Sequence, residues 1–344
     1  MTDFPSVLPD ARHAVLRGGP ALRWGVLAPG AIAHDWVTTV HANTDQRVHA
    51  VASRSAERAE RFAATHGIAR HYDSYEALVT DEGIDVVYVA APHSEHRRLA
   101  LLAVAAGKHV LIEKPLARSA IEAQAIAEAA RGAGVFAMEA MWSRFLPQTT
   151  VLARLLTDGV LGERRWAAAD FGVEFSFNPA SRAFDPALAG GALLDLGVYS
   201  LWFTHFALGA PARITASGSL ASTGVDAQAT VVLEYGDGVQ AVASASMLVG
   251  TPTVASINGT AARIEVDKKF LAPGGFRLVS ADDGRELRFT DPTSLRGRDG
   301  LCYQATAVAA HIADGRAEAP EHPLETSIAV LRVIDEARRQ LGAA

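Results

Sequence analysis

Residues 22–33 read LRWGVLAPGAIA, an apolar run of strand length that leads through a Pro-Gly turn into a helical pattern. This order places backbone N–H groups at the start of a helix, where they can hold the pyrophosphate of a dinucleotide. The match to the pattern G-x-G-x-x-G/A is imperfect, because Ala28 replaces the first glycine and Pro29 has no N–H to donate. We predict the first β-α unit of a dinucleotide-binding fold, with an ordinary α/β turn as the alternative. Its candidate cofactor contacts are Ala28, Gly30, Ala31 and Ile32.

The second predicted strand, residues 48–52, ends at Ser53 and Arg54. This point lies about 20 residues beyond the glycine turn, where such folds contact the adenosine ribose. An NAD site usually carries Asp or Glu here, and this chain has neither. A hydroxyl and a guanidinium suit the 2′-phosphate of NADP, because arginine offers a planar set of donors to a dianion. We predict NADP as the preferred cofactor and NAD as the second candidate; in the alternative, Arg54 is a solvated charge that begins the next helix.

Strand and helix patterns alternate up to residue 141. Ser119 can cap one of the helices, and Gly107 can end another. Further buried strands are predicted at 85–90, 109–113 and 135–138. This alternation predicts a Rossmann-type, doubly wound parallel sheet over residues 22–141, with right-handed crossovers.

The pattern changes after residue 141. Helices are predicted around 148–156 and up to Gly209, and short strands separated by turn pairs follow at 214–220, 227–235, 239–248, 253–257 and 263–266. We therefore predict a second, α+β domain over residues 142–344 with an open, mainly antiparallel sheet. Residues 1–21 contain three prolines and two glycines among mixed charges, which predicts an N-terminal arm.

Three side chains are candidate catalytic residues. Lys114 follows the strand 109–113, and the carboxyl ends of parallel strands are where open α/β sheets bind ligands. Asp195 and Tyr199 are four residues apart, so on a helix both project from one face. An amine, a carboxylate and a phenol are the groups needed to remove a proton from an alcohol. In the alternative, they are a surface cation, a helix-start acid and a core aromatic.

Composition narrows the class of protein. The chain has 344 residues, 49% hydrophobic residues and a net charge of -6, and it has no stripe of Lys or Arg, which argues against a nucleic-acid partner. The single cysteine, Cys302, fits a reducing compartment. We find no signal peptide and no apolar run that could cross a bilayer, and we predict a cytoplasmic protein. His93, Glu95 and His96 do not complete a metal shell, so no metal is predicted.

One face of the predicted second sheet carries apolar side chains, among them Val231, Leu233, Val242 and Met247. An exposed apolar face of this size is an aggregation hazard in a monomer. We predict that it is buried against a second copy in a two-fold interface, in a homodimer or a dimer of dimers.

From residue 22 onward the chain resembles the glucose–fructose oxidoreductase/inositol dehydrogenase/rhizopine-catabolism superfamily. Within it, the resemblance is to the dimeric dihydrodiol dehydrogenases, also described as NADP-dependent D-xylose 1-dehydrogenases. The matching stretches are 23–27, 51–55, 107–115, 138–147, 189–195 and 223–226. Ala28 departs from the superfamily's glycine. Tyr199 stands where many members have histidine, and this tyrosine is shared with the dihydrodiol subgroup.

The resemblance implies a Rossmann domain joined to an open-sheet domain, a pyridine nucleotide between them, dimerisation through the sheet, and catalytic roles for Lys114, Asp195 and Tyr199. It places Pro92, His96, Glu113 and Lys114 on the cofactor side. The candidate substrate contacts are Trp142, Arg144, Phe145, Arg182, Asp195 and Tyr199. Core packing is the alternative for Trp142 and Phe145, a helix-start role for His96, and an exposed loop for Arg182.

These residues lead to an expected reaction. Tyr199 accepts the proton of a sugar, polyol or cyclic trans-diol hydroxyl as the hydride leaves, and Lys114 lowers the pKa of the phenol from its ordinary value of about 10. Asp195 orients Lys114 or a second hydroxyl of the substrate. The alternatives are a non-catalytic nucleotide-binding regulatory protein, and a sugar–sugar oxidoreductase with permanently bound NADP.

Overall fold

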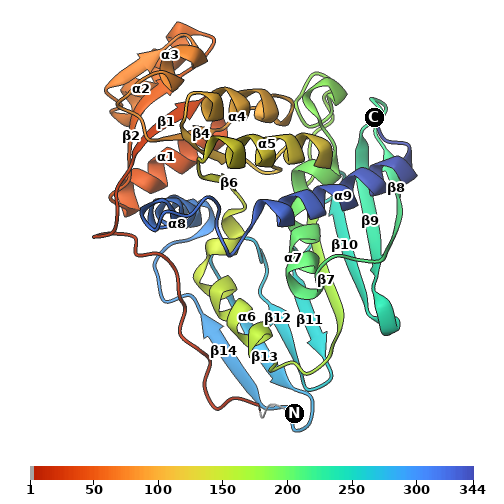
Figure 1. Ribbon diagram of the computed structural model, residues 1–344. Coiled ribbons are helices and arrows are strands. Elements are labelled where there is room, and N and C mark those ends of the chain that lie inside the picture. Colours follow the sequence, from red (N-terminus) through yellow and green to blue (C-terminus); the bar gives the residue numbers. More distant parts are fainter. Residues whose placement is uncertain (1–3) are drawn as a thin grey trace. The chain divides into compact units, whose positions relative to one another are not determined.

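Six parallel strands form the first sheet of the computed structural model, which describes residues 4–344 (Figure 1). Their order is β3-β2-β1-β4-β5-β6, the arrangement of dinucleotide-binding folds. The strands are β1 Arg23–Leu27, β2 Arg47–Ala52, β3 Arg70–Tyr72, β4 Val86–Val89, β5 His109–Ile112 and β6 Ala137–Glu139. The central strands are almost completely buried, which explains why they read as continuous apolar runs in the sequence. The predicted parallel sheet is confirmed.

The helices between these strands begin and end largely where local signals placed them. They are α1 Ala31–Asn43, α2 Ala56–His66, α3 Tyr75–Val79, α4 His96–Ala105 and α5 Ala120–Ala133. The Ser119 side chain accepts a hydrogen bond from the N–H of Glu122, so the predicted cap of α5 is present. Gly107 follows α4 with φ 73°, the left-handed conformation that ends a helix.

Eight strands form the second sheet, in the order β14-β13-β12-β11-β7-β10-β9-β8. They are β7 Arg164–Gly172, β8 Arg213–Leu220, β9 Asp226–Glu234, β10 Gln240–Ser246, β11 Ala255–Gly259, β12 Ala262–Val266, β13 Gly275–Ser280 and β14 Glu286–Thr290. The sheet is mainly antiparallel, as predicted, except that β7 and β10 are parallel. Sequence patterns missed β7, β13 and β14. The core of β7 reads Ala-Ala-Ala, a composition with low strand propensity.

Helix α7, Val198–Leu208, covers one face of this sheet and contacts β7, β10 and β11 (Figure 1). A π-helical segment, Leu193–Gly197, leads into it. Among the described residues, the stretch Pro186–Leu208 is long and apolar enough to cross a membrane, which differs from our prediction that no such run exists. Most of this stretch is buried within the fold, as in the core helix of a globular protein. Helix α6, Pro147–Thr157, also belongs to this part of the chain.

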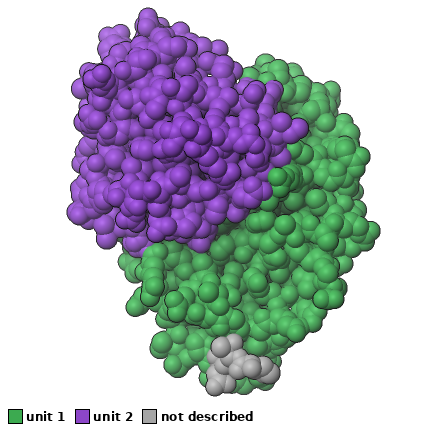
Figure 2. Space-filling view, viewed as in Figure 1, with its two compact units in different colours: residues 1–12, 146–296, 329–344 green, residues 13–145, 297–328 purple. Residues whose placement is uncertain are grey.

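The chain divides into two compact units, coloured separately in Figure 2. The parallel-sheet unit comprises residues 13–145 and 297–328, and the mixed-sheet unit comprises residues 4–12, 146–296 and 329–344. This division differs from the predicted ranges 22–141 and 142–344, because residues 297–328 return to the parallel sheet. Helix α8, Cys302–Ala313, contacts α1, and the N–H of Ala137 in β6 donates to the carbonyl of Ala317 at 3.0 Å. The last helix, α9 Leu324–Leu341, runs through both ranges.

The predicted N-terminal arm, 1–21, is held in place over its described part. The N–H of Gly18 donates to Asp45 Oδ2 at 2.6 Å, and that of Arg12 donates to Thr150 Oγ1 at 3.0 Å. Residues 1–3 of the arm lie outside the described residues.

The uncovered face of the mixed sheet carries a smaller apolar surface than predicted. Val231, Leu233 and Met247 are at most 2% exposed and point into the unit, so the prediction was wrong for these three. Val242 is half-buried, because in β10 it alternates with Ala241 and Ala243 on the covered face. Its partners across the neighbouring strands are Val232 and Ala168, and Trp166, two residues from Ala168, is 39% exposed.

Candidate active site

The turn after β1 is built for close approach of a ligand to the backbone. Ala28, which replaces the glycine of the common pattern, adopts a left-handed conformation with φ 59°. This is the conformation that glycine adopts readily, so the replacement of glycine by Ala28 leaves the geometry of the turn unchanged. Gly30 precedes α1, and a Cβ built on it would meet no atom within 4 Å. No side chain caps the helix and its first turn has no acidic residue, so the N–H groups of Ala31 and Ile32 can receive an anion.

The end of β2 presents the second candidate contact. Ser53 is buried, and its N–H donates to the carbonyl of Tyr72 at 3.1 Å. Arg54 is exposed and makes no ion pair within residues 4–344. A serine, Ser55, caps the following helix α2 by accepting from the N–H of Arg58. The structure therefore leaves the Arg54 guanidinium available to an external anion.

Lys114 follows β5 directly, and the acid before it is part of the core. Glu113 is 6% exposed; the Tyr88 hydroxyl donates to its Oε1, and the N–H of Lys114 lies 3.2 Å from its Oε2. Burial raises the pKa of Glu113 above its usual value, although the bond from Tyr88 and the charge of Lys114 oppose that shift. Both carboxylate oxygens are thus engaged by the protein, and the cofactor contact expected of Glu113 stays a prediction. Lys114 as a residue is half-buried.

His96 is the first residue of α4, in agreement with its helix-start alternative, and its cofactor contact stays a prediction. The ring is completely buried, with Nδ1 2.8 Å from the carbonyl of Pro115 and Nε2 2.9 Å from the carbonyl of Ala91. Burial lowers the pKa of His96, and the charge of Lys114 acts in the same direction. With both nitrogens occupied by backbone, His96 ties the segment after β4 to the segment after β5. Pro92, half-buried, begins the short helix His93–Glu95 between them.

The motif after β6 forms a short 3₁₀ helix, Trp142–Phe145. Trp142 and Phe145 are each 5% exposed, which agrees with the core-packing alternative. Arg144 donates from Nε to the carbonyl of Glu321 at 2.9 Å, and burial lowers its pKa to about 10. The guanidinium therefore has a structural contact in addition to any role toward a substrate.

Asp195 and Tyr199 lie together in the mixed-sheet unit. Asp195 sits in the π-helical segment before α7, and Tyr199 lies in the first turn of α7. Arg182 donates to Asp195 Oδ2 at 2.9 Å, which links the predicted loop residue to the predicted carboxylate. The ring of Phe171, in β7, packs edge-to-face on Tyr199 at a centroid distance of 5.8 Å. The arrangement combines one charged pair, one phenol and the ring of Phe171.

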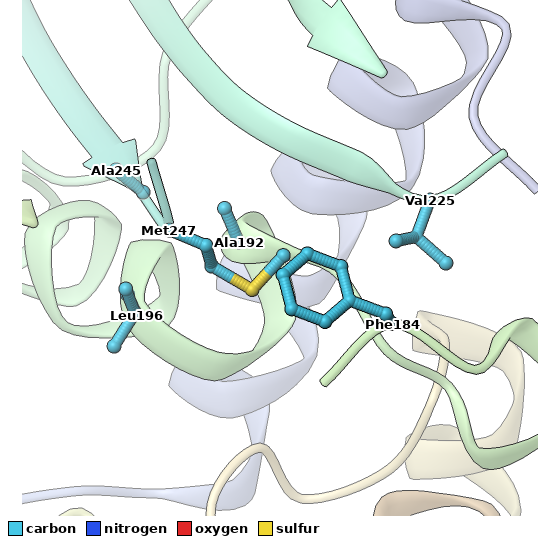
Figure 3. Close-up of a cluster of buried hydrophobic side chains, with 6 residues drawn as sticks. All are labelled: Phe184, Ala192, Leu196, Val225, Ala245 and Met247. Atoms are coloured by element: carbon cyan, nitrogen blue, oxygen red, sulfur yellow. The ribbon is translucent and has the colours of Figure 1, made fainter. Parts of the chain in front are cut away.

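An apolar cluster supports the helix that carries these residues. Figure 3 shows Phe184 and Met247 pointing toward each other beside Ala192 and Leu196. Phe171 and Phe175, both partly buried, pack against this cluster. The segment that carries Asp195 therefore packs against aromatic and aliphatic side chains.

Asp226 holds the start of the same helix, and sequence patterns gave it no role. Its Oδ2 accepts from the N–H of Leu193 at 2.6 Å, and a Cβ on Gly191 would clash with Oδ1. Burial raises the pKa of Asp226 to about 6, against the Leu193 bond and the charge of Arg338. Asp226 belongs to the stretch 223–226 that resembles the superfamily. Its partners Leu193 and Arg338 are distant in sequence, so no local pattern indicated its role. The described residues contain no group of three His, Cys, Asp or Glu side chains suited to a metal ion.

Comparisons with known proteins agree with this architecture. The model of an oxidoreductase family with an NAD-binding Rossmann fold matches residues 22–141, and that of the Gfo/Idh/MocA C-terminal domain matches residues 150–265. The trans-1,2-dihydrobenzene-1,2-diol dehydrogenase of Mus musculus is 38% identical over 333 residues, covering 94% of this chain and 97% of that protein.

Two solved structures illustrate the range of nucleotides bound by similar folds. A 3-ketoreductase from Actinomadura kijaniata, in complex with NADP and TDP-benzene, is 27% identical with a TM-score of 0.77, over 93% of this chain and 98% of that one. A levoglucosan dehydrogenase, in complex with NADH and levoglucosan, is 19% identical with a TM-score of 0.84, over 93% and 97%. The second match concerns the fold alone.

Proposed function

Since the chain belongs to the Gfo/Idh/MocA family of oxidoreductases, we propose that it is an NADP-dependent dehydrogenase that oxidises a trans-diol on a cyclic carbon ring. The observation that carries the choice of substrate is the packing of Phe171 on Tyr199, with the Arg182–Asp195 pair nearby. An aromatic wall favours a substrate with an apolar ring face, and a carboxylate can accept from a second hydroxyl. The matched diol dehydrogenases from several vertebrates point to the same class.

The acid/base roles follow from the chemistry of the side chains. We assign Tyr199 to accept the hydroxyl proton, Lys114 to keep the phenol acidic and to donate to the substrate oxygen, and Asp195 to orient a second hydroxyl. A free tyrosine titrates near pKa ~10, so a neighbouring cation has to lower that value by roughly 2 to 3 units for action near neutrality. Arg182 donates to Asp195 Oδ2 and limits the rotation of that side chain.

The nucleotide-side residues fit an NADP molecule. The open turn at Gly30 and the uncapped start of α1 would receive the pyrophosphate, and Arg54 would receive the 2′-phosphate. When bound, the nicotinamide supplies the hydride acceptor. We further propose a cytoplasmic location, for which the buried, unpaired Cys302 is the support.

The proposed function is tested with the purified full chain. Rates of NADP reduction are measured with cyclic trans-diols, aldopentoses, aldohexoses and inositols, and we expect the highest kcat/KM with a cyclic trans-diol. A higher kcat/KM with every sugar than with any diol would overturn the substrate choice. Ultraviolet absorbance of the protein as isolated separates a releasing dehydrogenase from a sugar–sugar oxidoreductase that retains its nucleotide.

Arg54→Ala is expected to raise the KM for NADP by roughly 10-fold or more and to leave the KM for NAD within about 2-fold, because only NADP loses a charge-assisted contact. Steady-state kinetics with both nucleotides measure the effect. Arg61→Ala is the matched control, since Arg61 lies on α2 but pairs with Glu57. Equal changes for NADP and NAD would remove the argument for a phosphate contact.

We propose a homodimer, or a dimer of dimers, through the uncovered sheet face around Val242, Val232 and Trp166. Val242→Asp is expected to weaken the assembly by at least 10-fold in Kd, because a buried unpaired charge is costly. Light scattering over a dilution series measures it. Ile121→Asp is the control, as Ile121 is 83% exposed in the parallel-sheet unit. A wild-type species of 36.3 kDa at micromolar concentration would contradict the proposal.

A further inference from the structure

Glu139 connects the turn after Lys114 to a distant part of the chain. The residue ends β6, and in the sheet it is the register partner of Ile112 in β5. Its Oε1 accepts a hydrogen bond of 2.8 Å from the N–H of Leu116, two residues beyond Lys114. A buried backbone donor in this turn is therefore satisfied by a side chain and not by the sheet.

The other oxygen of the same carboxylate binds the C-terminal segment of the parallel-sheet unit. His322 Nε2 lies 2.8 Å from Glu139 Oε2, and Ser327 Oγ donates to it at 2.6 Å. The residues Glu139, His322 and Ser327 are each at most 2% exposed. Burial alone would raise the pKa of Glu139, but the donors His322, Ser327 and Leu116 outweigh it and hold that pKa below its usual value. An ionised carboxylate that accepts from three donors holds the turn at Leu116 and the segment of His322 and Ser327 together.

A second buried side chain holds the same turn from another element. His96, at the start of α4, contacts the carbonyl of Pro115 through Nδ1 at 2.8 Å. Pro115 and Leu116, the two residues after Lys114, are thus each fixed by a buried side chain. The backbone that carries the Lys114 ammonium has little freedom to shift.

We propose that Glu139 is a positioning residue for Lys114, with His322 and Ser327 as its supports. This inference rests on the proposed catalytic role of Lys114. A lysine side chain is long and flexible, so the position of its ammonium depends on how firmly its backbone is held. Small displacements of a catalytic group reduce turnover. Loss of the Glu139 carboxylate leaves the Leu116 N–H unsatisfied and releases the turn.

The test is a double-mutant cycle on kcat with Glu139→Ala, Lys114→Ala and the combined variant. We expect Glu139→Ala to lower kcat roughly 10- to 100-fold and to leave the KM for NADP within about 2-fold. Glu139→Gln keeps an oxygen for the Leu116 N–H and is expected to restore most of the turnover. In the Lys114→Ala background, Glu139→Ala is expected to cost no further activity, because the two residues act as one unit.

The outcomes are distinguishable. An equal loss from Glu139→Ala in both backgrounds, or an unchanged kcat in Glu139→Ala, overturns the positioning role while the proposed function stands. A normal kcat in Lys114→Ala overturns the proposed function, and the inference about Glu139 falls with it. Should Glu139→Ala fail to fold, the same cycle with Ser327→Ala decides the question. We expect Ser327→Ala to lower kcat roughly 3- to 10-fold and to have no further effect on kcat in the Lys114→Ala background.

A control separates positioning from general destabilisation. Val104→Ala removes buried volume at the end of α4, before β5 begins, whereas Lys114 follows the other end of β5. We expect this variant to lower the melting temperature and to leave the pH profile of kcat unchanged. For Glu139→Ala we expect the pH profile of kcat to move to higher pH, because under the proposed function a displaced Lys114 lowers the pKa of the phenol less. A profile that does not move also overturns the inference.

Discussion

Tyr199→Phe is expected to lower kcat by about 100-fold or more, as the loss of a general base does. The substitution removes only the phenolic oxygen and keeps the ring that packs on Phe171, so the helix and its apolar base should remain intact. Binding of NADP, measured by fluorescence titration, is expected to stay within about 2-fold of wild type. Steady-state kinetics with a cyclic trans-diol measure the loss.

Tyr235→Phe is the matched control for this prediction. Tyr235 lies in the same unit, donates from its hydroxyl to the carbonyl of Gly209, and has a pKa raised to about 12 by burial, so it cannot serve as a base near neutrality. Near-normal turnover of Tyr199→Phe between about pH 6 and 10 would show that the phenol is not the base. Lys114 would then be the candidate for that role.

Lys114→Ala is the second large expected effect, with kcat lowered about 100-fold or more. Under the roles proposed above, Lys114→Ala removes the cation that lowers the pKa of the Tyr199 phenol and one donor to the substrate oxygen. The remaining activity should therefore rise with pH to a higher limit than in the wild type, which a pH profile of kcat measures. Lys114→Arg keeps a charge but changes its shape and reach, and it is expected to recover only part of the activity.

Lys108→Ala provides the comparison at the other end of β5. The Lys108 ammonium donates to the carbonyls of Asp81 and Ile84, both at 2.8 Å, so its loss should reduce stability and leave kcat unchanged. If Lys108→Ala and Lys114→Ala lowered kcat equally, the effect of Lys114 would be structural. Thermal unfolding of both variants separates the two cases.

Much of the parallel-sheet unit could be predicted because its signals are local. The strand-turn-helix order at 22–33, the Ser119 cap and the Gly107 stop each depend on residues a few positions apart. Strand-end position and helical spacing made Lys114, Asp195 and Tyr199 candidates, and the resemblance implied catalytic roles for the same three; the structure pairs Asp195 with Arg182 inside one unit. Ala28 is instructive, since a residue that breaks the glycine pattern still takes the backbone conformation of glycine.

Other features depend on contacts between residues far apart in sequence. Strand β7 is rich in alanine and forms because neighbours on both sides supply its hydrogen bonds, so its own composition carries little signal. Alternation showed which residues of β9 share a face, but packing against distant segments decides that Leu233 is buried and Val232 only half-buried. The bonds of Glu139 to His322 and Ser327 span 183 and 188 residues. Short-range patterns fix turns, caps and the succession of strands and helices along the chain, whereas strand order in the sheets and burial of charged and polar side chains depend on long-range packing.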